Sequence, residues 1–348
     1  MISMVTSHKP LYRTRLGQAI VGDSLVLLDG LESNSIDLVI TSPPFALQRK
    51  KEYGNKDQEE YVDWLLTFIS KVKRVLRESG SFVLDLGGAY EKGRPVRSIY
   101  NYRILVRACD ELGLRLAEEF FWFNPAKLPS PIEWVNKRKI RVKDSVNTIW
   151  WFSKSDFPKA DVKKVLIPYS DRMQQLLKNA SKFYKPKSRP SGHDISSAFD
   201  RDNQGAIPPN LLAIPNTGSN SRYMRLCKMA GVESHPARFP VELPTFFIQF
   251  LTDPGDLVVD IFAGSNVTGE AAERLDRKWI AFEMEHSYLA ASAFRLVDEL
   301  NPQEARELYS HLMEAPSVDN YIAPGQRSLM FVSDRKASYT GQKKRKRL

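Results

Sequence analysis

The sequence is poor in cysteine and has no long apolar run. Its 348 residues contain two cysteines, Cys109 and Cys227, which fit neither a metal-binding spacing nor a disulfide framework. This usage is typical of proteins of the reducing cytoplasm. No apolar stretch approaches the ~18 residues of a membrane-spanning helix, and the first residues lack the charged and apolar segments of a secretory signal. We therefore expect a cytoplasmic chain with no metal site and no membrane span.

Negative charge is also in short supply. Lysine and arginine number 51 against 41 for aspartate and glutamate, so the formal net charge is +10 and the pI is about 9.4. Such an excess favours a polyanionic partner, most simply nucleic acid. Scattered surface lysines would give the same total. Part of the excess lies in residues 343–348, and we expect residues 316–348 to form a basic, disordered tail.

Strands and helices alternate along much of the chain. Apolar runs predict strands at 35–40, 81–88, 117–123, 145–153, 256–262 and 278–284, and helical periodicity predicts helices at 59–80, 98–113, 239–252, 267–275 and 287–300. Gly80 and Gly113 are expected to end the first two helices. Strands that alternate with helices indicate an α/β fold, with a Rossmann-like, mostly parallel sheet and helices on both faces.

Residues 161–234 interrupt this alternation. Seven prolines occur from Pro168 to Pro236, with little periodicity between them. The segment is too long for an idle loop in a compact domain. We interpret it as a small domain or an insertion that carries recognition. Residues 1–160 and 235–315 would then form the two halves of the main domain.

The turn that follows the strand at 256–262 has the composition of a ligand-binding turn. The small residues Ala263, Gly264 and Ser265 would let a ligand approach the free amides at the helix start. Glu283 lies 19 residues after Gly264 (283 − 264), near the ~20-residue offset at which an acid binds ribose hydroxyls. Because Gly-x-Gly-x-x-Gly is missing, S-adenosylmethionine fits better than a pyrophosphate. A purely structural turn would give the same glycines, but the acid at this offset favours binding.

The stretch "TSPPF", residues 41–45, ends the first predicted strand. It resembles motif IV of the DNA methyltransferases that modify exocyclic amines, in its cytosine-N4 form. "VVDIFAGSN" (258–266) resembles their motif I, with Asn266 where the pattern has a glycine, which leaves the backbone less free. "HPARFP" (235–240) resembles their motif X. The catalytic motif comes first, which is the permuted order of the β class. From about residue 18 to 300 the chain is similar to β-class cytosine-N4 DNA methyltransferases.

The resemblance implies methyl transfer from S-adenosylmethionine to N4 of a cytosine extruded from double-stranded DNA. The amine is a poor nucleophile because its lone pair is delocalised into the ring. The Ser42 hydroxyl and the Pro43 carbonyl would accept its hydrogens. Pro43 and Pro44 would fix the turn, and Phe45 would stack on the base. Methylation at carbon 5 would need a thiol, usually after proline, and neither cysteine fits, so both are expected to be packing residues.

The resemblance also implies the remaining contacts. The residues expected around S-adenosylmethionine are Asp23, Arg238, Phe239, Asp260, Phe262, Ala263, Gly264, Ser265 and Glu283, and those expected on DNA are Arg49, Lys50, Lys51, Arg189, Ser191 and His193. Several have a competing interpretation. Asp23 could instead cap a helix or face DNA, Arg238 could form an exposed salt bridge, and His193 could be held by a neighbour in its loop. The cations at 49–51 could be merely solvated.

One member of the family is similar over still longer stretches, such as "FWFNPAKLPSPIEWVNKRKIRVKD" (121–144). This similarity implies the target CAGCTG, a monomer or weak homodimer, and a separate restriction endonuclease. Residues 161–234 would be the target-recognition region. Two alternatives stay open: adenine-N6 methylation in the same pocket, and a catalytically inactive DNA-binding protein. Serine at position 42, in place of Asp or Asn, argues against the adenine reaction.

Overall fold

The computed structural model describes residues 8–44, 58–179, 201–314, 320–322 and 330–331. Their strands form one sheet. In order across it they are β11 (Met330–Phe331), β10 (Asn320–Tyr321), β1 (Tyr12–Arg13), β2 (Gly17–Val21), β9 (Lys278–Glu283), β8 (Leu257–Asp260), β3 (Ile36–Thr41), β4 (Leu76–Leu86), β6 (Val146–Ser153), β5 (Arg115–Phe123) and β7 (Leu211–Ala213). The run from β2 to β4 is parallel throughout. This confirms the Rossmann-like α/β fold.

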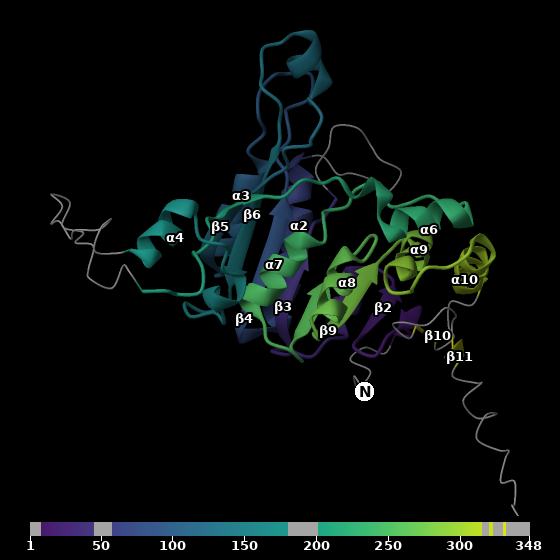
Figure 1. The fold of residues 1–348 in the computed structure, drawn as a ribbon. Helices are drawn as coiled ribbons and strands as arrows, with labels where there is room; N and C mark the ends of the chain where they lie inside the picture. Colours follow the sequence, from purple (N-terminus) through teal and green to yellow (C-terminus); the bar gives the residue numbers. More distant parts are fainter. Residues whose placement is uncertain (1–7, 45–57, 180–200, 315–319, 323–329, 332–348) are drawn as a thin grey trace, which may run out of the picture.

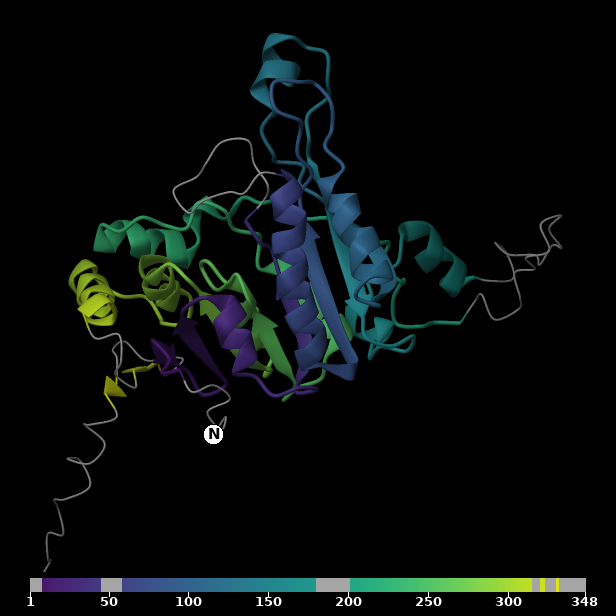
Figure 2. The ribbon, with the colours of Figure 1, turned by 180° about the vertical axis from the view of Figure 1, so that it is seen from behind.

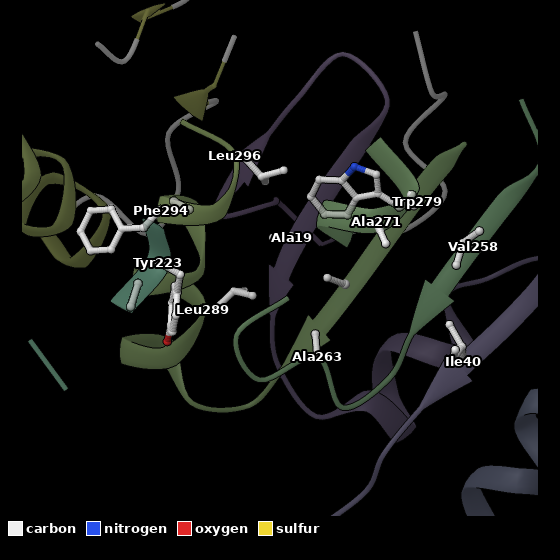
Figure 3. Close-up of a cluster of buried hydrophobic side chains, with 14 of the residues drawn as sticks. Ala19, Ile40, Tyr223, Val258, Ala263, Ala271, Trp279, Leu289, Phe294 and Leu296 are labelled. Atoms are coloured by element: carbon white, nitrogen blue, oxygen red, sulfur yellow. The ribbon is translucent and has the colours of Figure 1, made fainter. Parts of the chain in front are cut away.

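Helices cover both faces of the sheet (Figures 1 and 2). One face carries α1 (Ser24–Asp29), α2 (Gln58–Val75) and α3 (Tyr100–Asp110), and the other carries α7 (Glu242–Leu251), α8 (Val267–Arg274) and α9 (His286–Ser292). Beyond α9 lie α6 (Arg222–Ala230) and α10 (Pro302–Glu314), which contact each other. Two buried clusters result, one on each face. Figure 3 shows the cluster on the α9 side, where Tyr223, Leu289 and Phe294 meet.

The central strands are apolar because both of their faces are covered. Every residue of β3 is buried, as expected for a strand inside a parallel sheet. On α2, Leu65, Phe68 and Val72 fall on one face and are buried against the sheet. This helical spacing is the one that the sequence predicts.

The first predicted helix is wrong at its end. It stops at Val75, and residues 76–80 instead begin β4. The pairing of β4 with β3 shifts between Ile36 and Leu38, which accommodates the extra residues. A Cβ on Gly80 would lie 2.9 Å from the Ile36 carbonyl oxygen, so glycine permits a close strand approach here. Gly113 does follow α3, with φ at +64°.

Some elements extend beyond the predictions. β2, α1, α6 and α10 lie where no element was predicted, and the last predicted helix ends at Ser292, followed by a single turn, η5 (Ala293–Arg295). Residues 320–322 differ from the expected disordered tail, because β10 pairs with β1 and Ile322 is buried. The rest of the expected tail, apart from β11, lies outside the described residues.

The described part of residues 161–234 is built onto the main body. It contains η2 (Val162–Val165), α4 (Asp171–Lys178), β7, η4 (Gly218–Asn220) and α6. β7 pairs with β5 at the edge of the sheet, and α6 contributes Tyr223 and Leu226 to the core. Its role in target recognition stays a prediction.

Candidate functional site

The two halves of the chain meet at one edge of the sheet. The parallel strands β3, β4, β8 and β9 all end at this edge, which we call the carboxyl edge; the opposite edge is the amino edge. β3 from the first half lies between β4 and β8, so residues 41–44 come next to the turn that follows β8. Ligands of open α/β sheets bind at such carboxyl edges.

A buried hydrogen bond joins the two halves. Thr41 Oγ1 donates to Asp260 Oδ1 at 2.6 Å, and Thr268 Oγ1 donates to Asp260 Oδ2 at 2.6 Å. The Phe262 amide also donates to Oδ1, at 3.1 Å. Burial raises the pKa of Asp260, and these hydrogen bonds oppose the rise. Both oxygens of Asp260 therefore hold the site together, while its expected contact with the cofactor stays a prediction.

The turn after β8 is held in a left-handed conformation at two positions. Gly264 has φ at +52°, and a Cβ there would lie 3.0 Å from the His235 ring. Asn266 has φ at +54°, and asparagine tolerates this region better than most residues. Its side chain accepts from the Gly269 amide at 3.0 Å and donates to the Tyr12 hydroxyl at 3.0 Å. Asn266 thus adopts the left-handed conformation in place of the motif I glycine, and its side chain also caps α8.

Replacing Asn266 by alanine is expected to lower the free energy of unfolding by about 2 kcal/mol. Loss of the cap costs about 1 kcal/mol, and a Cβ-bearing residue without a polar side chain at this φ costs about 1 kcal/mol more. Asn266→Gly loses the cap but relieves the backbone, so it should be the milder change. Urea unfolding of both variants measures this. An alanine variant no less stable than the glycine variant would contradict it.

Glu283 and the glycine turn lie together, as their spacing predicts. Glu283 Oε2 accepts from the Gly264 amide at 2.7 Å, and Oε1 accepts from the Glu285 amide at 2.9 Å. Burial raises the pKa of Glu283 despite these two hydrogen bonds. A carboxylate at the end of β9 thus lies beside the glycine turn that follows β8, which is the arrangement that suits ribose hydroxyls.

The neighbouring positions differ in what their side chains contact. Phe262 packs against Trp64 and Phe68, with ring centroids 5.7 and 4.9 Å apart. Ala263 is buried. Ser265 is also buried, and its hydroxyl accepts from Arg295 at 2.9 Å. The Ser265 carbonyl also accepts from Arg295 Nε, at 2.6 Å, so Arg295 holds both the side chain and the backbone oxygen of Ser265.

Three other predicted cofactor residues are tied to the protein itself. Asp23 caps α1 by accepting from the Leu25 amide at 2.9 Å, so the N-cap interpretation is confirmed. Arg238 donates to Ser234 Oγ at 3.3 Å and to the His235 carbonyl. Within the described ranges no carboxylate lies at ion-pair distance from Arg238. Phe239 packs on the core beneath. The expected cofactor contacts of all three stay predictions.

The catalytic motif lies at the end of β3. Thr41 and Pro43 are buried, and Ser42 and Pro44 are half-buried. The other predicted catalytic residue and the predicted DNA contacts fall outside the described residues; they are Phe45, Arg49, Lys50, Lys51, Arg189, Ser191 and His193.

Asp85 is a site residue that the sequence analysis missed. It lies on β4 beside Ser42, is 4% exposed, and accepts from Asn147 Nδ2 at 3.1 Å. The Ser42 hydroxyl donates a hydrogen bond to the same carboxyl group. Burial raises the pKa of Asp85 to about 6, while the bonds from Asn147 and Ser42 and the charge of Lys127 oppose the rise. The sequence did contain a signal for this residue, because Asp85 is the one acid within the apolar run "SFVLDL" (81–86).

The Ser42–Asp85 pair has a definite chemical use. When Asp85 is ionised it accepts a hydrogen bond from the Ser42 hydroxyl. The lone pairs of the serine oxygen then stay free to accept from another donor. An ionised acceptor also strengthens that hydrogen bond and makes the serine oxygen more negative. The pair can therefore accept an N–H from an amine and receive its proton.

The two cysteines take no part in this arrangement. Cys227 is buried in the core, and burial raises the pKa of its thiol to about 11. Burial also raises the pKa of Cys109. Both thiols are packing residues, as expected. Among the described residues no three metal-ligating side chains gather in one place, and no described helix has the length and hydropathy to cross a membrane.

Comparisons with known proteins agree with this geometry. The DNA methylase family matches residues 36–294. The type II methyltransferase M.PvuII of Proteus hauseri is 60% identical over 312 residues, covering 89% of this chain and 93% of its own length. The solved structure of the PvuII DNA methyltransferase (cytosine-N4-specific) aligns with a TM-score of 0.74 and 53% identity, covering 90% of this chain and 98% of that one. DNA adenine methyltransferase YhdJ of Escherichia coli (strain K12) is 24% identical, covering 82% of this chain and 84% of its own length. Because this family match spans residues 36–294, well over half of the chain, this chain belongs to the DNA methylase family.

Proposed function

We propose that this chain is a site-specific DNA methyltransferase that moves a methyl group from S-adenosylmethionine to the exocyclic N4 of a cytosine in double-stranded DNA. The observation that carries the proposal is the Ser42–Asp85 pair at the carboxyl edge, one strand away from the turn at Gly264 and Glu283. The 60% identity with M.PvuII over nearly all of the chain supports the cytosine-N4 reaction.

The residues of the turn fit S-adenosylmethionine. A Cβ on Gly264 would lie 3.0 Å from the His235 ring, so glycine suits this close-packed turn, and the half-buried Glu283 carboxylate lies next to it. Glu283 would bind the ribose hydroxyls, and the backbone of residues 262–265 would hold the methionine part. When bound, S-adenosylmethionine supplies an electrophilic methyl group on a positively charged sulfur. Binding and orientation would supply most of the rate enhancement.

The Ser42–Asp85 pair would act on the cytosine amine. The base must leave the duplex, since its amine is otherwise paired. Ser42 Oγ and the Pro43 carbonyl would accept the two N–H groups and aim the nitrogen lone pair. As N4 forms its new bond, its proton would pass to Ser42 Oγ while the Ser42 proton passes to Asp85. Asn147, which donates to Asp85, would keep that carboxyl group in place.

Adenine-N6 methylation is the second candidate, because the adenine methyltransferase YhdJ matches 82% of this chain. Both reactions use an amine acceptor in the same pocket. A nucleoside digest of methylated DNA, analysed by mass spectrometry, separates them. We expect N4-methylcytosine, and N6-methyladenine alone would overturn the proposal.

The similarity to M.PvuII also suggests the target CAGCTG. Tritiated methyl transfer to a CAGCTG duplex should exceed transfer to the same duplex already methylated at the inner cytosine. Equal labelling of the two would refute this target. We further propose that the chain works in the cytoplasm as a monomer or weak homodimer, beside a separate restriction endonuclease. Residues 49–51 and 185–196 are the proposed DNA contacts, within a recognition region at 161–234.

A further inference from the structure

Two excursions of the chain project together from the carboxyl edge. One is formed by residues 88–98, which follow β4, and the other by residues 124–145, which join β5 to β6 and include a short helical turn, η1 (Glu133–Lys137). Together we call them the arm, which stands at the top of Figures 1 and 2. Its two parts are joined by the Arg97–Asp144 ion pair at 2.6 Å and by a bond from Arg141 to the Pro95 carbonyl at 2.7 Å.

The arm is built next to the catalytic pair. The chain leaves β4 just after Asp85 and returns to β6 just before Asn147, which donates to Asp85. Lys127 lies close enough that its charge lowers the Asp85 pKa. A duplex whose cytosine reaches Ser42 must therefore pass beside the arm.

The second part of the arm is strongly basic. Residues 124–145 contain six lysines and arginines and two acids. Both acids are already paired: Glu133 with Lys137 and Arg138, and Asp144 with Arg97. Within the described chain, Lys127, Lys139, Arg141 and Lys143 have no carboxylate partner. Arg141 and Lys143 donate to backbone carbonyls of the arm instead. The cations left without such a bond are the exposed Lys139 and the half-buried Lys127, which lies on the side of the arm near Asp85.

The same segment exposes large apolar side chains. Val142 is 87% exposed and Leu128 is 80% exposed, while Ile132 and Ile140 are 62% and 49% exposed. Single exposed apolar residues are ordinary on a protein surface, but four of them among unpaired cations on one projection are not. Proteins that distort duplex DNA combine cations on phosphates with apolar side chains against unstacked base steps.

We propose that the arm grips the duplex beside the extruded cytosine, with Lys127 and Lys139 on phosphates and Leu128 and Val142 against the opened base stack. This inference rests on the proposed function and adds a DNA-contacting surface outside residues 161–234. Duplex DNA is the occupant because the arm is basic and stands on the same edge as Ser42. Binding of a protein partner or of a second copy of the chain would not depend on the position of the arm beside Ser42.

Two double variants separate the two kinds of contact. Lys127→Gln with Lys139→Asn should weaken duplex binding about tenfold at 0.1 M salt and reduce the slope of log K against log [salt] by about 2, since each phosphate contact contributes about 0.9. Asparagine suits position 139, where φ is +55°. Fluorescence anisotropy with a labelled CAGCTG duplex measures both quantities.

Leu128→Ser with Val142→Ser should leave that salt slope unchanged and reduce base extrusion at least about fivefold, because the unstacked step loses its apolar cover. The probe is 2-aminopurine at the target position, whose fluorescence rises when it leaves the stack. These side chains are almost fully exposed, so the variants should keep the melting temperature of the parent.

Matched controls lie at the amino edge. Phe157 is 89% exposed and follows β6, whose last residue Ser153 pairs with Ser81 of β4, and Ser81 in turn pairs with Leu38 near the start of β3. Lys163 is an exposed cation near the same edge. Phe157→Ser and Lys163→Gln should change neither salt slope nor extrusion. Arm variants that behave like these controls would overturn the inference, as would arm variants that alter sedimentation of the DNA-free protein while binding DNA normally.

Failure of the arm and failure of the proposed function are distinguishable. If the unaltered protein makes no N4-methylcytosine, the function is wrong whatever the arm does. If it makes N4-methylcytosine and the arm variants retain its kcat/KM on duplex DNA, only the arm inference is wrong. With a single-stranded substrate, which needs no unstacking, the Leu128→Ser, Val142→Ser variant should keep its activity.

Discussion

Ser42→Ala is expected to lower kcat by about 10²–10³-fold and to leave the affinity for S-adenosylmethionine unchanged. The variant removes the oxygen that would accept the cytosine N–H and pass its proton to Asp85, and loss of one such preorganised group costs about 3–4 kcal/mol in transition-state stabilisation. Single-turnover methyl transfer gives the rate constant of the chemical step, free of product release. Equilibrium dialysis gives the affinity for S-adenosylmethionine.

The chain offers a matched serine at the other end of β3. Ser35 immediately precedes β3 at the amino edge, where its hydroxyl donates to the Glu32 carbonyl at 2.6 Å. Ser35→Ala should retain full kcat, and Ser42→Thr, which keeps a hydroxyl, should lose less than Ser42→Ala. A Ser42→Ala variant with normal single-turnover rate would end the case for the Ser42–Asp85 pair.

Asp85→Asn is expected to lower kcat about 100-fold, a loss typical of an acid–base group, and to change the pH dependence. Asp85 has a pKa of about 6 in the folded protein. The rate of the parent should therefore rise with pH through about 6, because the carboxylate forms there and accepts the hydrogen bond from Ser42. Asp85→Asn cannot ionise and should lose this rise. Single-turnover rates between pH 5 and 8 measure it.

The contribution of Asp85 to folding stability should fall as pH rises, whereas its contribution to the rate should increase. Its pKa rises from the ordinary 3.8 to about 6 on folding, so the folded state holds the proton more tightly. The resulting stability is fully present below about pH 4 and is lost as pH rises through about 6. Asp85→Asn removes that loss and should be more stable than the parent at pH 8, by about 3 kcal/mol.

Asp276→Asn is the control for both measurements. Asp276 is exposed, forms an ion pair with Arg15 at the amino edge, and has a φ of +58° that asparagine also adopts. It should keep the rise of rate near pH 6. An Asp85→Asn variant that is slow but keeps that rise would show that another group produces it.

The sequence predicted the central sheet because its signals are local. Apolar runs identified β3, β4, β8 and β9, and the residue spacing that joins Gly264 to Glu283 identified the cofactor turn. Asp85 was missed because its meaning depends on a neighbour: only the register of β4 against β3 brings it beside Ser42. The end of α2 was misplaced for a similar reason, since Gly80 permits close approach to β3 rather than ending a helix.

Asn266 and Ser265 illustrate what motif matching leaves out. The general motif has a glycine at position 266, and Asn266 adopts there a left-handed φ of +54°, a conformation that glycine adopts without strain. Yet the hydrogen bonds of Asn266 to Tyr12 and of Ser265 to Arg295 depend on side chains far apart in the sequence. Long-range partners of this kind leave no pattern in a single sequence.

The strand order has a consequence for synthesis on the ribosome. β2 and β3 are made early, but the two strands between them, β8 and β9, are made only at residues 257–283. Until then a nascent chain presents β3 as an unpaired, apolar margin on that side, the kind of surface that promotes aggregation. The Thr41–Asp260 bond can form only after this late insertion. The enzyme therefore becomes active only near the end of translation. Chains that terminate before residue 257 should aggregate and have no methyltransferase activity.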